Sequence, residues 1–198
     1  MAVYDDEHDE ETHDGFGGRM LIAMPGIGDG RFERALIFVC AHSDEHAMGI
    51  VVNRPLEGLT VPELLDRLGV ASDIALPPQA VLSGGPVERE RGFVLHTDDF
   101  VTNDATLPVA DGVALTATRE VLEAMGDADR RPRYAMLALG YAGWGAGQLE
   151  DELKENVWLT CDPDEELLFG SDYDGKWSRA LEKIGVDAAK LSSLTGSA

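Results

Sequence analysis

The chain has 198 residues, of which 44% are hydrophobic, 27% charged and 7% aromatic. This usage is typical of a globular protein and excludes the fibrous, disordered and disulfide-rich classes. A chain of this length buries about 70% of its surface on folding, which is enough for one core. Sixteen Lys and Arg against 37 Asp and Glu give a net charge of −21, so the average face repels a phosphate backbone or an anionic membrane. We therefore expect no direct binding of nucleic acid or membrane.

The chain divides into an acidic segment and one domain. Residues 1–14 carry seven acids and no Lys or Arg, and we expect residues 1–16 to form a disordered tail. Residues 17–198 contain no repeat, heptad or long linker and are predicted to be a single domain. Cys40 and Cys161 each lie within or at the end of an apolar run, which favours buried free thiols. With no secretory signal and no apolar stretch approaching eighteen residues, these features predict a cytoplasmic protein.

Short apolar runs predict the strands. Residues 20–24 form a buried strand that is stopped by Pro25. Residues 35–41 and 48–52 are separated by six polar or small residues and predict a hairpin-like pair. The other strand candidates are residues 81–82, 92–96, 113–116, 134–139 and 157–160. Because these runs are continuous rather than alternating, many strands are expected to be covered on both faces.

Capping residues and apolar stripes predict the helices. Thr60 and Glu63 form a capping box ahead of apolar positions with helical spacing. Asp162, followed by a proline and by Glu165, predicts another helix start with Asp162 as the N-cap. Three further helices are predicted from Val121, Leu122 and Met125 after Thr118, from Leu149, Leu153 and Val157, and from Trp177, Leu181 and Ile184.

The segment from His42 to His46 matches the H-x-x-E-H pattern of one class of zinc peptidases. Zinc binding would require both histidines on one face of a helix, but here the segment links two predicted strands and leaves room for one helical turn at most. No third ligand with suitable spacing is visible. We therefore expect no metal, and we interpret His42 as a loop histidine that hydrogen-bonds to the backbone.

The densest glycine cluster, residues 140–150, follows a buried strand and precedes a helix. A strand, a glycine-rich loop and a helix N-terminus together cradle phosphates in many proteins. Here the first helical turn already holds Glu150, Asp151 and Glu152, which would repel a phosphate. The favoured interpretation is that the glycines let the backbone turn around Trp144 and pack against the sheet.

Two other segments contain residue types that are found in catalytic or DNA-binding sites. Ser83-Gly84-Gly85-Pro86 lacks the pattern of a nucleophile elbow and is interpreted as a structural turn. Residues 130–133 include three arginines, whereas a duplex footprint needs something like 6 to 10 phosphate contacts. No helix-turn-helix follows the helix that starts at Thr60. Sequence-specific DNA binding by this chain alone is therefore not expected.

Several blocks of the chain combine glycines with apolar and aromatic residues in an unusual order. They are residues 18–25 with Asp29 and Phe32, His42-Ser43, residues 47–55, 84–87, 92–96, 140–150 with Trp158, and 191–198. Together they resemble the bacterial YqgE/AlgH family from about Gly17 to the last residue. Family members usually have glycine at the position of His46, so this histidine is interpreted as incidental. The resemblance implies an α+β fold with a curled, branched mixed β-sheet that resembles a partial barrel with flanking helices.

The family is largely uncharacterised and is often labelled a transcriptional regulator, and the resemblance supplies no catalytic residue and no cofactor. We assign none. Because the charge and the missing helix pair disfavour operator binding, we expect a non-enzymatic regulatory protein that acts through a protein partner of unknown identity. Scaffolds usually place binding sites on loops beside strands. The residues expected to meet on one such surface are His42, Asn53, Arg54, Gly84, Gly85, His96, Gly143, Trp144, Gly145, Gly147, Gln148 and Glu150.

An alternative function stays open at this point. The chain could be a small-molecule-binding protein or an enzyme, with His42, Asn53 and His96 around a pocket. The backbone N–H groups of the glycine-rich loop, residues 143–147, would then serve as hydrogen-bond donors to the ligand.

Overall fold

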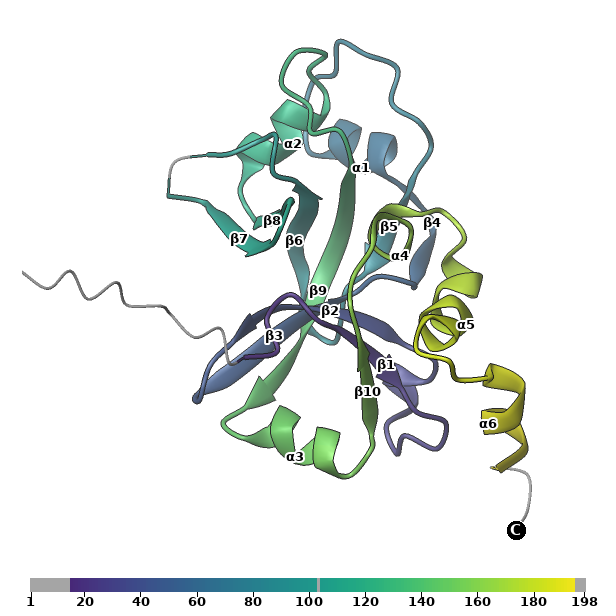
Figure 1. Cartoon of the computed structure of the whole chain (residues 1–198). Helices are drawn as coiled ribbons and strands as arrows, with labels where there is room; N and C mark the ends of the chain where they lie inside the picture. The colour runs from purple at the N-terminus through teal and green to yellow at the C-terminus, as the bar shows by residue number, and fades with distance from the viewer. Residues whose placement is uncertain (1–14, 103, 195–198) are drawn as a thin grey trace, which may run out of the picture.

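The structure is a computed structural model that describes residues 15–102 and 104–194. Most of the predicted acidic tail, residues 1–14, lies outside this range, whereas Phe16 is half-buried against an apolar cluster. Within the described residues, ten strands form one sheet with the path β10-β1-β2-β3-β9-β6-β8-β7. The sheet branches at β9, which also pairs with β5 in parallel, and β5 pairs with β4. The predicted fold class, a curled and branched mixed sheet with flanking helices, is confirmed (Figure 1).

The elements follow the chain with these bounds. The strands are β1 (Met20–Ala23), β2 (Leu36–His42), β3 (His46–Val51), β4 (Pro55–Thr60), β5 (Ala80–Ser83), β6 (Val87–Thr97), β7 (Thr106–Ala110), β8 (Val113–Thr116), β9 (Ala135–Gly145) and β10 (Trp158–Cys161). The helices are η1 (Gly30–Phe32), α1 (Val61–Arg67), α2 (Arg119–Met125), α3 (Gln148–Lys154), α4 (Glu165–Phe169), α5 (Tyr173–Lys183) and α6 (Ala188–Leu194). None of the helices in the described part of the chain is long and apolar enough to cross a membrane.

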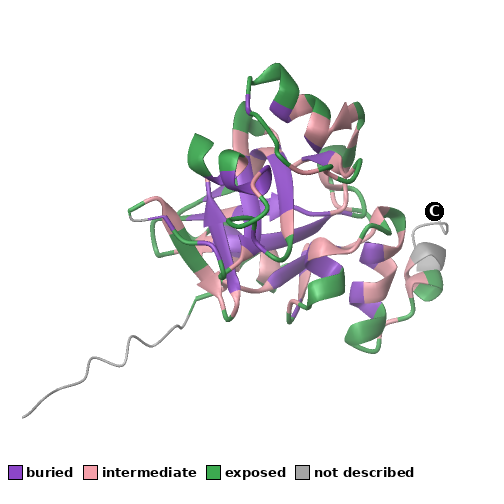
Figure 2. Cartoon of the chain, turned by 90° about the horizontal axis from the view of Figure 1, so that it is seen from above, coloured by how far each residue is buried: buried purple, intermediate pink, exposed green. Residues whose placement is uncertain are grey.

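Both faces of the central strands are covered, as the continuous apolar runs predict. In β1, Met20 and Ile22 join one apolar cluster, while Leu21 and Ala23 join another. The first cluster lies under α4 and α5, the second under α3, and a third under α1 and α2. Buried residues therefore concentrate on the strands, and the exposed ones on the surrounding helices and loops (Figure 2). The predicted hairpin is confirmed, since β2 and β3 pair antiparallel.

The capping box at α1 is confirmed. The Thr60 hydroxyl accepts from the Glu63 amide at 3.5 Å, and the Glu63 carboxylate accepts from the Thr60 amide at 2.8 Å. Helix α2 forms where Thr118 predicts it, although the Thr118 side chain makes no capping hydrogen bond. Helix α3 ends before Val157, the last residue of its predicted apolar stripe.

The predicted start of α4 at Asp162 is wrong. The N-cap is Asp164, whose carboxylate accepts from the Leu167 amide at 2.8 Å. Strand β10 continues to Cys161, which pairs with Met20, and Asp162 forms an ion pair with Arg19. The pairing ends at Cys161, the Asp162 carboxylate is engaged by Arg19, and the helix begins only after Asp164.

Strands that depend on partners were predicted least well. The sequence missed β4 and β7, whose prolines and glycine read as loop, and it missed α6. Strand β6 starts at Val87 rather than at Gly92, across a register shift that accommodates four charged residues. Strand β9 runs to Gly145, so most of the predicted glycine-rich loop is strand.

Candidate functional site

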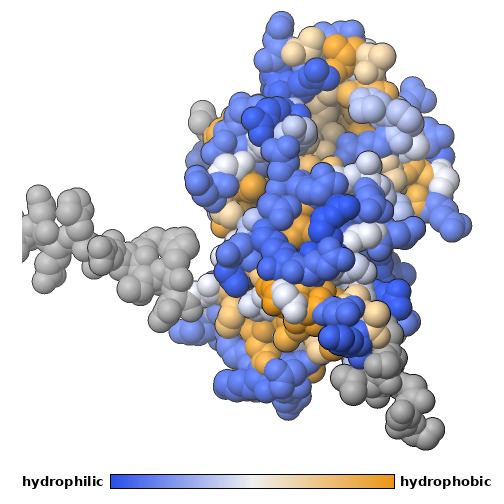
Figure 3. All heavy atoms as spheres, turned by 45° about the vertical axis from the view of Figure 1, so that its right-hand side comes forward, coloured by the Kyte–Doolittle hydropathy of each residue, from blue (hydrophilic) through white to orange (hydrophobic). Residues whose placement is uncertain are grey.

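A depression lies between the loop around η1 and helix α3. It encloses about 470 Å³. We call it the groove, and its lining residues are Ile27, Gly28, Asp29, Arg31, Phe32, Pro86, Val87, Gly143, Trp144, Gln148, Glu152, Glu155, Val157 and Trp158. On the face shown in Figure 3, hydrophobic residues gather between hydrophilic rims in the lower half of the molecule, at the height of β1, β10 and α3 in Figure 1.

One wall of the groove is built around the carboxylate of Glu152 on α3. Oε2 accepts hydrogen bonds from the indole N–H of Trp144 at 2.9 Å and of Trp158 at 2.7 Å. Oε1 accepts from the side-chain amide of Gln148 at 2.9 Å, and that amide oxygen in turn accepts from the Gly145 backbone at 3.0 Å. The two indole rings meet edge to face with centroids 6.0 Å apart. Both tryptophans are buried in an apolar cluster, so this wall is a rigid aromatic base that exposes only the edges of the indoles, with a negative charge fixed beside it.

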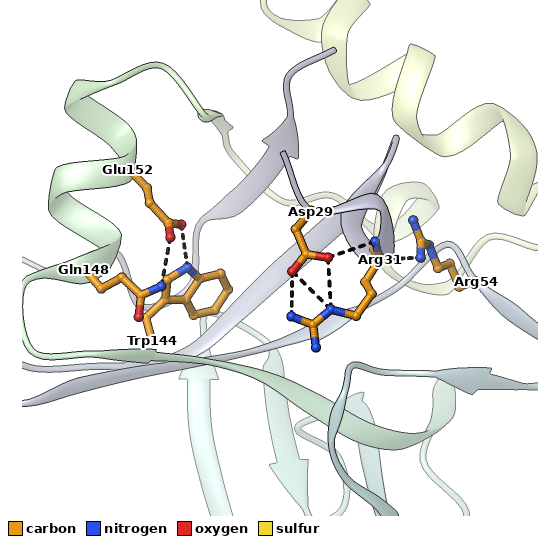
Figure 4. A network of polar contacts seen from close by, with 6 residues as sticks. All are labelled: Asp29, Arg31, Arg54, Trp144, Gln148 and Glu152. Carbon is orange, nitrogen blue, oxygen red and sulfur yellow. Dashed lines mark hydrogen bonds and ion pairs between the residues drawn. The ribbon is translucent and has the colours of Figure 1, made fainter. Parts of the chain in front are cut away.

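The opposite wall is built around Arg31 in η1. Asp29 caps η1 by accepting from the Arg31 amide at 3.0 Å, and its carboxylate also accepts from Nε and Nη2 of the Arg31 guanidinium, the shortest contact being 2.6 Å. These hydrogen bonds from Arg31 hold the pKa of Asp29 below its ordinary value. The Arg31 carbonyl accepts from Nη1 of Arg54, and the Glu33 carbonyl from Nη2 at 2.6 Å. Figure 4 shows Asp29 and Arg31 between the Trp144–Glu152 cluster and Arg54.

A smaller cavity of about 120 Å³ adjoins the groove. We call it the side pocket, and its lining residues are Arg31, Phe32, Val51, Arg54, Ser83, Gly85, Pro86 and Arg89. Arg31, Phe32 and Pro86 line both spaces, so the two lie side by side. The site therefore has carboxylates at one end and arginines at the other, with aromatic surface between them.

A family model described as AlgH-like matches residues 20–189. The chain belongs to the AlgH-like family. A UPF0301 protein of Caulobacter vibrioides strain NA1000 is 65% identical over 181 residues, which are 91% of this chain and 93% of the relative. A UPF0301 protein of Bradyrhizobium diazoefficiens is 53% identical over 188 residues, which are 91% of this chain and 87% of the relative.

Two solved structures resemble the AlgH-like chain. The solution structure of the AlgH protein from Pseudomonas aeruginosa superposes with a TM-score of 0.72 at 37% identity, covering 96% of this chain and 97% of that one. A crystal structure of a Corynebacterium diphtheriae protein superposes with a TM-score of 0.67 at 19% identity, covering 82% of this chain and 85% of that one. The second likeness shows the fold alone.

The structure brings only part of the predicted surface together in this AlgH-like chain. Gly143, Trp144 and Gln148 line the groove, and Arg54 and Gly85 line the side pocket. The predicted residues that line neither space are His42, Asn53, Gly84, His96, Gly145, Gly147 and Glu150. Of these, Gly145 donates a backbone hydrogen bond to the side chain of Gln148, which lines the groove, and Gly147 is the N-cap of α3 with a φ of 71°.

His42 and Glu150 form a pair of their own. The His42 Nε2 lies 2.5 Å from the Glu150 carboxylate, and Nδ1 accepts from the Phe16 amide at 3.3 Å. A backbone hydrogen bond, followed by the one from His42, lowers the pKa of Glu150. His46 stands across the hairpin turn from His42 rather than on a shared helix face, and no group of three or more His, Cys, Asp or Glu among the described residues is arranged to hold a metal. The pair ties the N-terminal segment to α3.

Asn53 and Gly84 serve the sheet. The Asn53 side chain accepts from the Leu36 amide at 3.0 Å and donates to the Arg34 carbonyl at 2.9 Å, which joins the ends of two strands. At Gly84, an added Cβ would lie 2.3 Å from the Gly140 carbonyl oxygen, so only glycine permits this packing of the strands.

His96 lies on β6 in the protein core and lines neither the groove nor the side pocket. It is fully buried, with Nε2 2.8 Å from the Thr116 hydroxyl and Nδ1 2.8 Å from the Thr97 carbonyl. Burial lowers the pKa of His96 and favours the neutral ring. Its polar atoms are therefore engaged inside the fold and not in the groove.

Sequence reasoning missed Asp29, Arg31, Arg89, Glu152 and Trp158 as lining residues. Two of them carried a local signal, because an aspartate two residues before an arginine is placed to cap the turn and pair with its side chain. The others depend on which strands become neighbours, and nothing in their own surroundings in the sequence marks them.

Proposed function

We propose that this chain is a regulatory protein that acts by binding a protein partner, and that the groove holds a segment of that partner. The observation that carries the proposal is the lining of the groove. Tryptophan and arginine are the residues that most often dominate protein-binding surfaces; here an exposed Arg31 lies beside Trp144 and Trp158, which are largely buried and expose only their edges to the groove. The hydrogen bonds to Glu152 and Asp29 fix these side chains before binding, which lowers the entropy lost on association.

Electrostatics support a protein partner over DNA. The chain carries a net charge of −21, and the arginines within residues 130–133 are partly neutralised by neighbouring carboxylates. Arg133 lies 2.9 Å from the Glu165 carboxylate, and Arg130 lies 3.6 Å from that of Glu120. A DNA-binding surface needs several unpaired cations in a row, because affinity comes largely from phosphate neutralisation.

Fluorescence anisotropy with labelled duplex DNA tests the first half of the proposal. We expect only weak binding, abolished as the salt concentration is raised to physiological values. A tight, sequence-selective complex at physiological salt would refute indirect regulation.

Site-specific photocrosslinking tests the second half. A photoreactive phenylalanine analogue replaces Val87, an exposed apolar residue on the rim of the groove, or Leu107, an equally exposed residue on β7 that serves as the matched control. We expect a discrete adduct with one protein in the source bacterium at position 87 and none at position 107. The partner, once purified, should bind the wild-type chain and bind a Val87→Glu variant, which alters an exposed lining residue and leaves the core intact, at least tenfold more weakly. Equal adducts at both positions would contradict the assignment of the groove.

A thermal-shift screen against nucleotides, phosphorylated metabolites and divalent metals addresses the small-molecule alternative. The side chains that this alternative assigns to ligand binding, those of His42, Asn53 and His96, are engaged in hydrogen bonds within the protein. We expect no saturable stabilisation that His42→Ala or Gly145→Ala removes. Stabilisation of several degrees that either variant abolishes would favour a ligand-binding protein or enzyme instead.

A further inference from the structure

Three arginines from distant parts of the sequence converge on the side pocket. Arg31 comes from η1, Arg54 directly precedes β4, and Arg89 lies in the first part of β6. The remaining lining residues are apolar, glycine, proline or the hydroxyl of Ser83, and no lining residue is acidic. In a chain with 37 acids and 16 bases, a cavity lined by three cations and no anion runs against the average composition.

The arginines retain donors that the fold does not use. Asp29 occupies Nε and Nη2 of Arg31, and Nη1 has no acceptor among the described residues. Arg89 and the Ser83 hydroxyl likewise have no hydrogen-bond or ion-pair partner within the described part of the chain. Arg54 is held by two backbone carbonyls, and its burial lowers its pKa, an effect that the charge of Glu33 opposes. Charged donors facing a cavity are stabilised when an anion accepts from them.

The backbone beneath the side pocket is fixed. At Gly85, which has a φ of 153°, an added Cβ would lie 2.0 Å from the Tyr141 carbonyl carbon. The Ser83 amide donates to the Arg54 carbonyl at 2.8 Å, which holds the two segments together. The donors of Ser83 and Arg54 therefore sit on a rigid support, which is the condition for recognising a small group with defined geometry.

From these observations we propose that the side pocket is an oxyanion-binding site that takes a carboxylate or phosphate group. A volume of about 120 Å³ holds such a group but not a whole nucleotide or cofactor. Arginine forks bind both groups through paired N–H donors. Because the pocket adjoins the groove, the oxyanion comes either from a free small anion or from the acidic side chain of a protein segment lying in the groove.

The test follows the Arg Nε–H signals of the isotopically labelled full-length chain by NMR at constant ionic strength. Three probes are titrated separately: inorganic phosphate, succinate, and a capped peptide with one glutamate beside a phenylalanine. We expect at least one probe to give saturable shifts at Arg31, Arg54 and Arg89. A response to phosphate or succinate alone identifies a free anion as the source, and tighter binding of the peptide identifies an acidic protein segment.

Arg89→Gln and Arg91→Gln form the matched pair of variants. Both remove one exposed arginine from β6, but Arg91 faces Glu88 and Phe93 and does not line the side pocket. We expect Arg89→Gln to weaken binding about tenfold and Arg91→Gln to leave it unchanged. The absence of any saturable shift, or equal weakening by both variants, would overturn the proposal. The result is independent of the crosslinking experiment, since small anions can occupy the pocket whether or not a protein fills the groove.

Discussion

Removal of the Glu152 carboxylate tests whether the aromatic wall of the groove is held as the geometry indicates. The Glu152→Ala variant deprives the indole N–H groups of Trp144 and Trp158 of their acceptor. A buried donor left unpaired costs about 1–3 kcal/mol. Because Glu152 is only half-buried and lines the groove, we take the lower part of this range for each indole, which predicts a total loss of roughly 2–3 kcal/mol.

The matched control is Glu155→Ala. Glu155 also lines the groove at the end of α3 and carries the same charge, but it is exposed and its carboxylate makes no hydrogen bond within the described residues. This variant should change the free energy of unfolding by about 0.5 kcal/mol or less. Comparing the two variants removes the general effect of taking one negative charge from an acidic chain.

Urea unfolding followed by tryptophan fluorescence and circular dichroism gives both free energies. The predicted loss in Glu152→Ala corresponds to a melting temperature lowered by about 4–12 °C for a chain of this length. Glu152→Gln keeps one oxygen as an acceptor and should lose about half as much. If Glu152→Ala and Glu155→Ala unfold at the same urea concentration, the two indoles do not depend on this carboxylate and the argument for a preorganised wall fails.

Three further predictions concern the scaffold. Burial lowers the pKa of Lys176 to about 8. Because the unfolded chain keeps this proton up to about pH 10.5, the free energy of unfolding should rise by roughly 2 kcal/mol from pH 7.5 to 9.5. The Lys176→Met variant, measured by the same urea unfolding, should lack this rise. Burial also lowers the pKa of His96, so the unfolded chain binds a proton more readily below about pH 6.5; the wild type should lose stability between pH 7 and 5, and His96→Gln should lose less. Gly85→Ala places its Cβ 2.0 Å from the Tyr141 carbonyl carbon and should cost at least about 3 kcal/mol by thermal unfolding, whereas Gly17→Ala, with open space around it, should change stability by about 0.5 kcal/mol or less.

Elements whose signals are local were predictable from the sequence. The capping box of Thr60 and Glu63 fixes the start of α1 with contacts only three residues apart, so no knowledge of the rest of the fold is needed. The reverse holds for the helix after β10. There a pattern of the same strength at Asp162 was overridden because the Asp162 carboxylate pairs with Arg19, which lies far away in the sequence, and Asp164 caps the helix instead.

The glycine-rich block shows why the site itself was harder to predict. Gly143, Trp144 and Gly145 read as a loop because glycine weakens a strand. They form the end of β9 because they pair with Met48, Ala47 and His46 of β3, a partnership that spans almost a hundred residues. Local propensity carries no information on such a pairing. The positions of the residues that the strand brings into the groove therefore could not be predicted either.

The position of the groove follows from a change of partners along β9. This strand pairs with both β5 and β6 at Ala138 and Leu139, with β6 as far as Tyr141, and with β3 from Ala142 onward. Gly143 and Trp144, just beyond the change, line the groove. Where neighbouring strands separate, no further strand fills the surface beside them, and here η1 and α3 close the sides of the opening. The strand pairing thus determines where the groove lies, whereas the lining side chains determine its charge. Substitutions of the lining, such as Arg89→Gln, should therefore change binding without changing the fold, whereas Gly85→Ala, which disturbs the pairing, should impair both.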